Sequence, residues 1–272
     1  MPKMTAGYRR SVLGILRQRR WIGFTLVTLM FLLLFVRLGI WQLSRLHERR
    51  SYNAVISANL DAKPASYTDV VQTSGGTPIV TSALEWRSIE ITGHWDLAHQ
   101  VLLRNRTFES VDGYEVITPL VPASGPALLV DRGWIQQGST SAAPAAVPVP
   151  QTGIVTVTAW LRPSQPGRPA STLPAGQILA INAPSIAVGV PYPVVDGYAI
   201  LEKEDPAPAG SPTLLPGPEV DDGPHFSYAM QWFLFASVAV VGWWIYVRRE
   251  ADEAPEQVLD RSTELPDSVQ LG

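Results

Sequence analysis

The sequence predicts a membrane-anchored α+β protein, in which an antiparallel β-barrel or sandwich-like domain lies between an N-terminal and a C-terminal transmembrane helix. Two long apolar runs, one near each end of the chain, predict the helices. Between them, short segments that alternate apolar and polar side chains predict strands. Charged residues make up only 17% of the chain, against about 25% in an average soluble domain, which indicates that part of it lies in lipid.

The first apolar run occupies residues 21–43 and contains one charge, Arg37. Such a run is long enough to cross a hydrocarbon core about 30 Å thick. Arg37 lies near one end of the run, where its long side chain can extend to the interface. No cleavage site follows, so we expect an uncleaved anchor. The helix should continue through residues 44–60, which contain neither Pro nor Gly.

The second apolar run occupies residues 226–247 and contains no formal charge. Aromatic residues lie at both of its ends, as is typical of segments that reach both headgroup regions of a bilayer. A buried helix of a soluble protein is the alternative. Neither run, however, has the polar face that a soluble helix needs.

The distribution of basic residues predicts how the two runs are oriented. Residues 1–20 contain Lys and Arg but no acid, and Arg248 and Arg249 directly follow the second run. By the positive-inside rule both termini then face the cytoplasm and the central region lies outside it. Arg45, Arg49 and Arg50, which follow the first run, oppose this orientation but are fewer.

We therefore expect a multi-pass protein of a bacterial-type plasma (inner) membrane, in contact with the lipid bilayer. Its segments are a cytoplasmic basic N-terminus (1–20), transmembrane helix 1 (21–43), an extracytoplasmic β-rich domain (44–225) with a Pro-rich tether (204–224), transmembrane helix 2 (226–247) and a cytoplasmic, acidic, disordered tail (248–272).

Short segments rich in β-branched and aromatic residues predict the strands of the central domain. They are residues 86–91, 100–104, 114–120, 127–131, 153–161, 177–181 and 198–202. Turn residues separate them, among them Gly93, Gly113, Gly125, Gly176 and Gly197. Because these turns are local and no strand–helix alternation occurs, we expect one antiparallel barrel or sandwich.

Composition excludes several functional classes. The chain has no Cys, so disulfides, thiolate metal sites and Cys nucleophiles are excluded. A net charge of −3 gives no support for nucleic-acid binding. The usual catalytic signatures, such as G-x-S-x-G, H-E-x-x-H and the Walker loop, are also absent from the sequence.

Two histidines lie close together in the sequence, at His94 and His99. They could bind a metal ion, but metal sites usually need three or four ligands, so exposed polar residues are the favoured interpretation.

Basic residues end two of the predicted strands. Arg104 and Arg106 end one, and Arg132 lies with Asp131 and Trp134 at the end of another. On neighbouring strands they could form a cationic corner, in which Asp131 pairs with an arginine and Trp134 covers it. Such a corner could bind a carboxylate-bearing ligand or partner, such as haem propionates. The alternative is an internal ion pair that stabilises a turn.

His225 lies where the second apolar run begins, close to Tyr228 and Trp232. A neutral imidazole at an apolar interface can ligate haem iron while aromatic neighbours pack on the macrocycle. Alternatively, His225 is an ordinary interfacial residue at the end of a span.

Six motifs, in order, resemble those of the Surfeit locus protein 1 family. They are LGIWQLSR (38–45), GHWD (93–96), LRNR (103–106), GYEVITPL (113–120), LVDRGWI (129–135) and SYAMQWF (227–233). The likeness extends from about residue 38 to residue 236 and has the same layout of two helices. Each motif alone is weak, but six in sequence are specific.

The resemblance implies a non-enzymatic assembly chaperone for haem–copper cytochrome c oxidase, which assists delivery of haem a to the catalytic subunit. It also implies that His225, at the position matching a family histidine linked to haem a, is a candidate iron ligand, in stable or in transient binding of haem a. The expected partners are the catalytic subunit and the respiratory complex, and no nucleic acid. A permanent accessory subunit of the oxidase is the alternative, and an extracytoplasmic enzyme that uses His94 or His99 is a third hypothesis.

Overall fold

The structure is a computed structural model that describes residues 14, 16–71, 77–138, 146–167 and 173–253. The chain forms two compact units. One, the helical unit, comprises residues 1–50 and 222–272, and the other, the β unit, comprises residues 51–221. Most of the predicted basic N-terminus and most of the predicted acidic tail lie outside the described residues.

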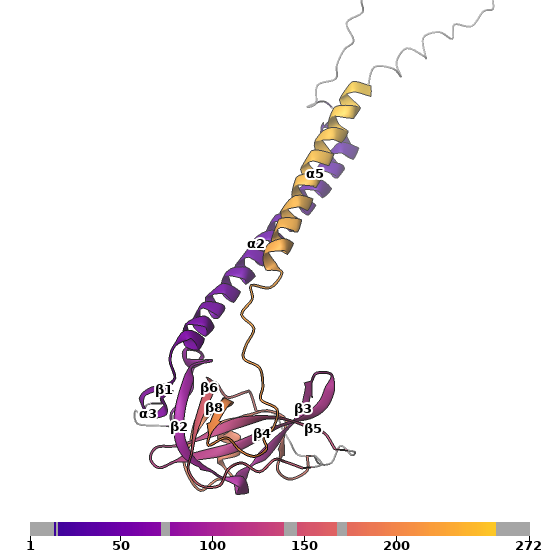
Figure 1. Cartoon of the computed structure of the whole chain (residues 1–272). Helices are drawn as coiled ribbons and strands as arrows, with labels where there is room; N and C mark the ends of the chain where they lie inside the picture. Colours follow the sequence, from indigo (N-terminus) through magenta and orange to yellow (C-terminus); the bar gives the residue numbers. More distant parts are fainter. Residues whose placement is uncertain (1–13, 15, 72–76, 139–145, 168–172, 254–272) are drawn as a thin grey trace, which may run out of the picture. The chain divides into compact units, whose positions relative to one another are not determined.

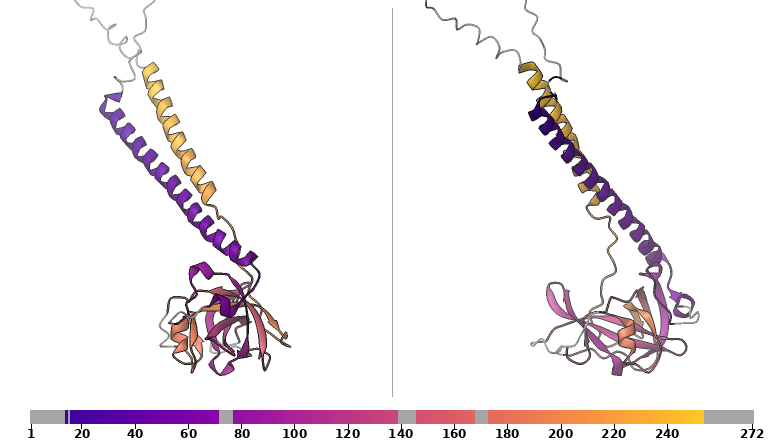
Figure 2. Two further views of the ribbon diagram at one scale, coloured as in Figure 1. Left: turned by 90° about the vertical axis from the view of Figure 1, so that its left-hand side faces the viewer. Right: turned by 180° about the vertical axis from the view of Figure 1, so that it is seen from behind.

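The helical unit consists of two long helices that run along each other (Figures 1 and 2). They are α2 (Arg19–Asp61), which continues into the β unit, and α5 (His225–Glu253). Both are long and apolar enough to cross a membrane. The expected continuation of the first helix beyond residue 43 is therefore confirmed.

Eight residues of α2 that are at least partly buried recur in alternating steps of four and three. They are Trp21, Thr25, Thr28, Leu32, Phe35, Gly39, Gln42 and Leu46. This heptad spacing is the pattern of helices that pack as a coiled coil. On α5 the matching positions include Ala229, Trp232, Ala236, Trp243 and Val247. We call the contact between these two rows the seam.

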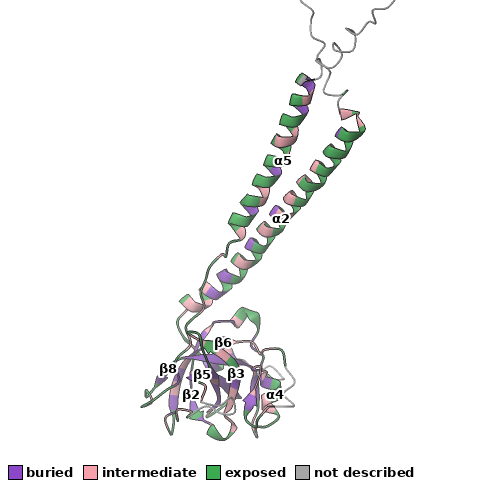
Figure 3. Cartoon of the chain, turned by 90° about the vertical axis from the view of Figure 1, so that its right-hand side faces the viewer, coloured by how far each residue is buried: buried purple, intermediate pink, exposed green. Residues whose placement is uncertain are grey.

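Several contacts define the seam. The Nε1 atom of Trp243 donates to Oγ1 of Thr25 over 3.0 Å, and the rings of Phe35 and Trp232 stack with their centroids 5.8 Å apart. Gly39 lies so close to Phe233 that a Cβ atom on Gly39 would be 2.6 Å from the ring. Away from the seam, both helices expose apolar side chains (Figure 3).

The β unit contains an eight-stranded mixed sheet in the order β1-β2-β6-β8-β5-β4-β3-β7. Its strands are β1 (Ala65–Ser66), β2 (Ser88–Trp95), β3 (Val101–Phe108), β4 (Val111–Pro122), β5 (Ala127–Gln136), β6 (Val155–Arg162), β7 (Gln177–Ile178) and β8 (Val194–Asp205). Short helices accompany them: α3 (Tyr67–Val70), α4 (Ala183–Ala187), and the single turns Ser82–Leu84 and Leu97–His99.

The expectation of a purely antiparallel sheet is wrong. Strands β5 and β8 pair in parallel, as do β1 with β2 and β3 with β7. Strand β2 pairs with both β6 and β4, so that the pairings β2–β6–β8–β5–β4 return to β2. The barrel stays a prediction, which this connectivity supports.

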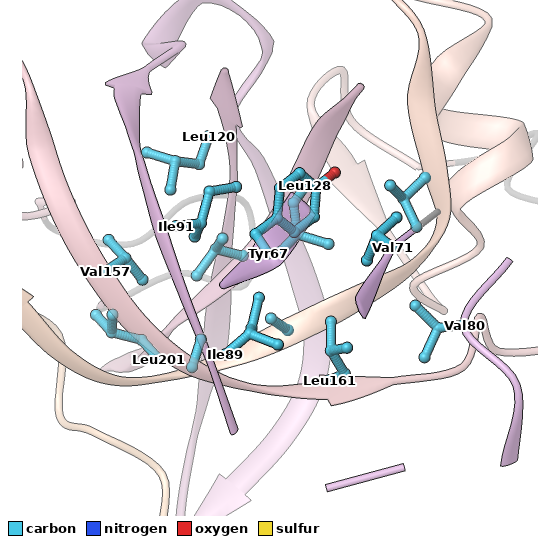
Figure 4. Close-up of a cluster of buried hydrophobic side chains, with 14 of the residues drawn as sticks. Tyr67, Val71, Val80, Ile89, Ile91, Leu120, Leu128, Val157, Leu161 and Leu201 are labelled. Carbon is cyan, nitrogen blue, oxygen red and sulfur yellow. The ribbon is translucent and has the colours of Figure 1, made fainter. Parts of the chain in front are cut away.

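The strands of that ring bury their side chains in one cluster (Figure 4). Ile89 and Ile91 of β2, Leu128 of β5 and Val157 and Leu161 of β6 lie there at 2% exposure or less. Buried and half-buried residues alternate along the whole of β6, as the period of two predicted. Each such aliphatic side chain contributes about 1.5–3 kcal/mol through burial.

Three glycines that were expected to mark turns, Gly93, Gly113 and Gly197, lie inside strands. Gly93 pairs with both Pro122 and Val155, and a Cβ atom there would lie 2.5 Å from the backbone oxygen of Val121. At Gly113 a Cβ atom would lie 2.2 Å from the backbone oxygen of Ile135. These positions need glycine because strands approach closely, which a sequence does not distinguish from a turn.

The first and last parts of the β unit are joined by side-chain contacts. In the last turns of α2, the amide of Asn53 donates to the backbone oxygen of Asp221 over 2.6 Å, and Ile56 packs in a second hydrophobic cluster with α4. Asn59 donates to the backbone oxygen of Glu85 over 2.9 Å.

The tether expected at residues 204–224 is only partly a free connection. Glu204 and Asp205 belong to β8. Thr213 forms two backbone hydrogen bonds of 2.8 Å with Trp134 of β5. Leu215 packs against the second cluster. The tether is therefore attached to the sheet along part of its length.

Candidate functional site

His225, the first residue of α5, is half-buried in the helical unit. Its Nδ1 atom lies 3.0 Å from Oε1 of Gln42, a seam residue of α2. An imidazole that donates its Nδ1–H to this oxygen keeps the lone pair of Nε2 free. Gly223 has a φ of +63°, and a Cβ atom there would lie 3.6 Å from Nε2. Glycine at 223 thus keeps bulk away from Nε2.

The two aromatic residues expected around His225 have different surroundings. Tyr228 is exposed. Trp232 lies in the seam, stacked on Phe35 and in edge contact with Phe235 at 5.9 Å. Of these two residues, only Tyr228 therefore has a ring that is not packed against another ring of the described residues.

The hydrogen-bonded imidazole of His225 fits the role of an axial ligand to haem iron. Neutral imidazole is a common axial ligand of haem iron, and its second ring nitrogen is usually hydrogen-bonded by the protein. His225 with Gln42 has this arrangement. A bound haem would supply the iron that Nε2 ligates.

The basic residues of the predicted cationic corner lie at two irregularities of the sheet. The register of β3 against β4 shifts between Leu103 and Arg106, where Asn105 has a φ of +59°. The register of β4 against β5 shifts between Glu115 and Ile117, opposite Asp131 and Trp134. Bulges of this kind redirect side chains, and here they bring residues of three strands together.

Arg106 and Glu115 form an ion pair at this place. The Nε atom of Arg106 lies 3.1 Å from Oε2 of Glu115, and Nε1 of Trp134 donates to the backbone oxygen of Arg106 over 3.0 Å. Arg104 donates to Oε1 of Gln177 over 3.0 Å. Arg104 and Arg106 are both half-buried.

Asp131, close to this ion pair, is buried, with 1% of its surface exposed. Its carboxylate accepts a hydrogen bond from the backbone N–H of Gly133 over 3.0 Å. Its side chain also forms a hydrogen bond with the carboxyl group of Glu115. Burial, together with the neighbouring charge of Glu115, raises the pKa of Asp131 well above its usual value. Burial likewise raises the pKa of Glu115, against the effect of Arg106. Burial and the mutual repulsion of the two carboxyl groups thus favour the protonated form of this pair.

Arg132 does not lie in an exposed cationic corner. Its side chain is fully buried, its guanidinium carbon lies 5.5 Å from the ring centre of Trp95, and Nη1 donates to the backbone oxygen of Pro148 over 3.2 Å. Successive residues of a strand point to opposite faces, so Asp131 and Arg132 cannot both join Arg106. Burial lowers the pKa of Arg132, and the charge of Glu204 acts in the opposite direction.

A family model described as the SURF1 family matches residues 29–237 of the chain. The chain belongs to the SURF1 family. An uncharacterised SURF1-like protein of Mycobacterium bovis is 31% identical over 238 residues, which cover 85% of this chain and 84% of the relative. A SURF1-like protein of Rickettsia felis is 27% identical over 232 residues, covering 82% of this chain and 96% of the relative. The resemblance to the Surfeit locus protein 1 family is thereby confirmed.

Membership of the SURF1 family implies a part in the assembly of cytochrome oxidase in general terms, and its members are assembly factors rather than enzymes. The SURF1 motifs coincide with the geometry above. The first motif contains Gln42, and the last begins two residues after His225. The LRNR and LVDRGWI motifs contain the bulged residues.

Sequence reasoning on this SURF1 chain missed Gln42, although one signal was present. Gln42 is a polar residue in an apolar run, at the same heptad position as Thr28 and Phe35. In a coiled-coil seam such a residue usually has a polar partner.

His94 and His99 do not form a pair in this SURF1 protein. His94 is exposed on β2, whereas Nδ1 of His99 lies 2.6 Å from Oδ2 of Asp96, which also accepts from the hydroxyl of Tyr192 over 2.5 Å. Although burial acts to raise it, the hydrogen bonds from Tyr192 and His99 hold the pKa of Asp96 below its usual value. His99 also lines a cavity of about 420 Å³. The described residues contain no group of three His, Cys, Asp or Glu that could hold a metal ion.

Proposed function

We propose that this chain is a membrane-anchored assembly factor for haem–copper cytochrome c oxidase that holds haem a on its way to the catalytic subunit. The single observation that carries the proposal is the hydrogen bond between Gln42 and His225. It joins Gln42 of the first SURF1 motif to the residue two positions before the last one, and it leaves one imidazole nitrogen free to ligate iron.

In this proposal α2 and α5 both span a bacterial-type plasma membrane. Their apolar outer faces would contact lipid, and the helix pair would be free to dock against the oxidase. Both termini would be cytoplasmic and the β unit extracytoplasmic. Alkaline phosphatase fused within the loop at residues 206–211 should be active, while the same fusion after residue 253 should be inactive. The reverse result would contradict this topology.

The haem site in this proposal is built around His225, with Tyr228 beside it. Arg104 and Arg106, which are both partly exposed, are the basic side chains that could bind propionates or a carboxylate of the oxidase. Arg132 is no longer a candidate for this contact, because it is fully buried. Its substitution should affect folding before any contact with a partner.

The haem proposal is tested with the full chain purified from cells that make haem a. His225→Ala should abolish the Soret band of the purified protein, whereas His47→Ala, a change at an exposed histidine of α2, should leave it unchanged. Full haem occupancy in the His225 variant would remove His225 as the ligand.

The assembly role has a separate test. Deleting the gene should lower the haem a signal in reduced-minus-oxidised spectra of membranes, together with oxidase activity. Complementation with the wild type should restore both, and normal spectra in the deletion strain would contradict the role. Co-purification in equal amounts with mature, active oxidase would instead favour a permanent accessory subunit.

A further inference from the structure

Gln42 and His225 are 183 residues apart in the sequence, yet they meet within the helical unit. Gln42 is half-buried in the seam, between Gly39 and Leu46, which are both buried. A primary amide in such surroundings is costly unless it is hydrogen-bonded. The imidazole of His225 provides that bond.

We propose that Gln42 is a positioning residue for His225. Its Oε1 atom accepts the Nδ1–H of the imidazole, so it fixes both the tautomer and the orientation of the ring, and Nε2 remains unprotonated. That Nε2 is thereby prepared to ligate haem iron rests on the proposed function. The control of the tautomer by Gln42 is independent of the proposed function, because it requires no haem.

The packing around Gln42 fixes the position of this contact. One turn before it on α2, Gly39 lies against the ring of Phe233, where no Cβ atom would fit. A further turn back, Phe35 stacks on Trp232. Both aromatic partners lie on α5 within the first turns after His225. The two helices therefore meet closely just beside the hydrogen bond, and neither can shift without disturbing it.

The surroundings of the other ring nitrogen support the same tautomer. A Cβ atom added to Gly223 would lie 3.6 Å from Nε2, and the positive φ of this residue favours glycine. No hydrogen bond from Nε2 to another of the described residues occurs. With one nitrogen bonded and the other open, the ring has the arrangement that protein ligands of metals usually adopt.

The direct test is the tautomer of His225 in the full chain, measured by ¹H–¹⁵N NMR of ¹⁵N-histidine-labelled protein in lipid nanodiscs without haem. The His225→Ala variant assigns its signal among the four histidines. The wild type should show a protonated Nδ1 and an unprotonated Nε2. Gln42→Met, which keeps the length but not the acceptor, should shift the tautomer ratio by about two- to tenfold towards Nε2–H.

Two further variants complete the test. Gln42→Glu keeps an acceptor and should retain the Nδ1–H form. Gln231→Met, a matched change on the exposed face of α5, should leave the ratio unchanged. A wild-type ring protonated on Nε2, or a ratio that does not respond to Gln42→Met, would overturn the proposal.

Haem binding then separates this inference from the proposed function. If His225 ligates haem a, Gln42→Met should weaken haem affinity by about 10- to 100-fold, as expected for loss of a group that orients a ligand, and should change the Soret spectrum of the bound fraction. A changed tautomer with unchanged haem affinity would support positioning by Gln42 and contradict ligation by His225.

Discussion

The carboxyl groups of Glu115 and Asp131 both have raised pKa values where strands β3, β4 and β5 meet, and Arg106 pairs with Glu115 there. Because the folded state raises the pKa of Asp131, folding favours its protonated form. The stabilisation from this proton is fully present below the unfolded pKa of the carboxyl group and is lost as the pH rises through the folded pKa. Each unit of pKa shift corresponds to about 1.4 kcal/mol.

Asp131→Asn should therefore flatten the dependence of unfolding stability on pH. The amide imitates the protonated carboxyl group: its oxygen can still accept from Gly133, and its N–H₂ can donate to Glu115. Relative to the wild type, the variant should gain stability as the pH rises from acid to neutral. Thermal unfolding of the full chain in detergent at several pH values measures this. An unchanged slope would show that Asp131 is already ionised in the folded protein.

Arg132 and Glu204 are two buried charged residues, and Trp95 contacts both of them. Nε1 of Trp95 donates to Oε1 of Glu204 over 2.9 Å, and both residues are buried. Removing one partner of a buried pair costs about 3–5 kcal/mol, because the other charge is left uncompensated.

Arg132→Met should accordingly destabilise the β unit by about that amount. Adding Glu204→Gln to it should recover much of the loss, since the amide needs no counter-charge. Denaturant unfolding of the single and double variants measures the coupling. Equal destabilisation in both variants would contradict a charge-based role for Arg132.

At the scale of elements, the alternation of side chains predicted most of the strands, because burial on one face of a sheet imposes a period of two. Strand β6 is an example, since its predicted and observed ranges nearly coincide. The turn between β3 and β4 was missed. It contains Glu109 and Ser110, both with positive φ, and neither residue type signals such a turn.

The pairing partners could not be read from the sequence. Parallel pairing of β5 with β8 depends on how the chain crosses the domain, and no local pattern encodes that path. The bulges at Asn105 and opposite Glu115 were hidden for the same reason. The expected grouping of Arg132 with Arg104 and Arg106 consequently failed.

Gly133 should be essential for attaching the tether to β5. It has a φ of +119°, and a Cβ atom there would lie 2.4 Å from the backbone oxygen of Thr213. Gly125→Ala is a matched control, because Gly125 has a φ of +91° but open space around it. Gly125→Ala should lower the stability of the protein only through backbone strain, by about 1–3 kcal/mol.

Gly133→Ala should cost more than this control, and it should speed hydrogen exchange at the amide of Thr213. Hydrogen exchange and thermal unfolding of both variants measure the difference. Equal effects of the two substitutions would indicate that the contact with Thr213 contributes nothing.

The seam of the helical unit allows a comparable test. Gly39→Leu should weaken packing against Phe233 by about 1–3 kcal/mol through overpacking, whereas Gly23→Leu, at a position with nothing within 4 Å, should not. Because the chain has no Cys, cysteines placed at Thr25 and Trp243 would report pairing through a short bismaleimide cross-link. Equal cross-linking in both variants would argue against the seam.

For the molecule as a whole, the family motifs were informative where the local chemistry was not. The resemblance directed attention to His225, whereas composition alone left it an ordinary interfacial residue. Its partner Gln42 could be identified only from the structure, because the seam brings opposite ends of the chain together. Family motifs that are distant in sequence are therefore candidates for direct contact.

The chain passes into and out of the β unit at one place. Arg50 forms an ion pair with Asp222 over 2.8 Å. One turn further along α2, the side chain of Asn53 donates a hydrogen bond to the backbone oxygen of Asp221. The β unit is thus an insertion in a helical hairpin, and insertions whose ends lie close together can often be exchanged. A protein in which a short Gly-Ser linker joins Arg50 to Asp222 should form the hairpin alone, with Gln42 still next to His225.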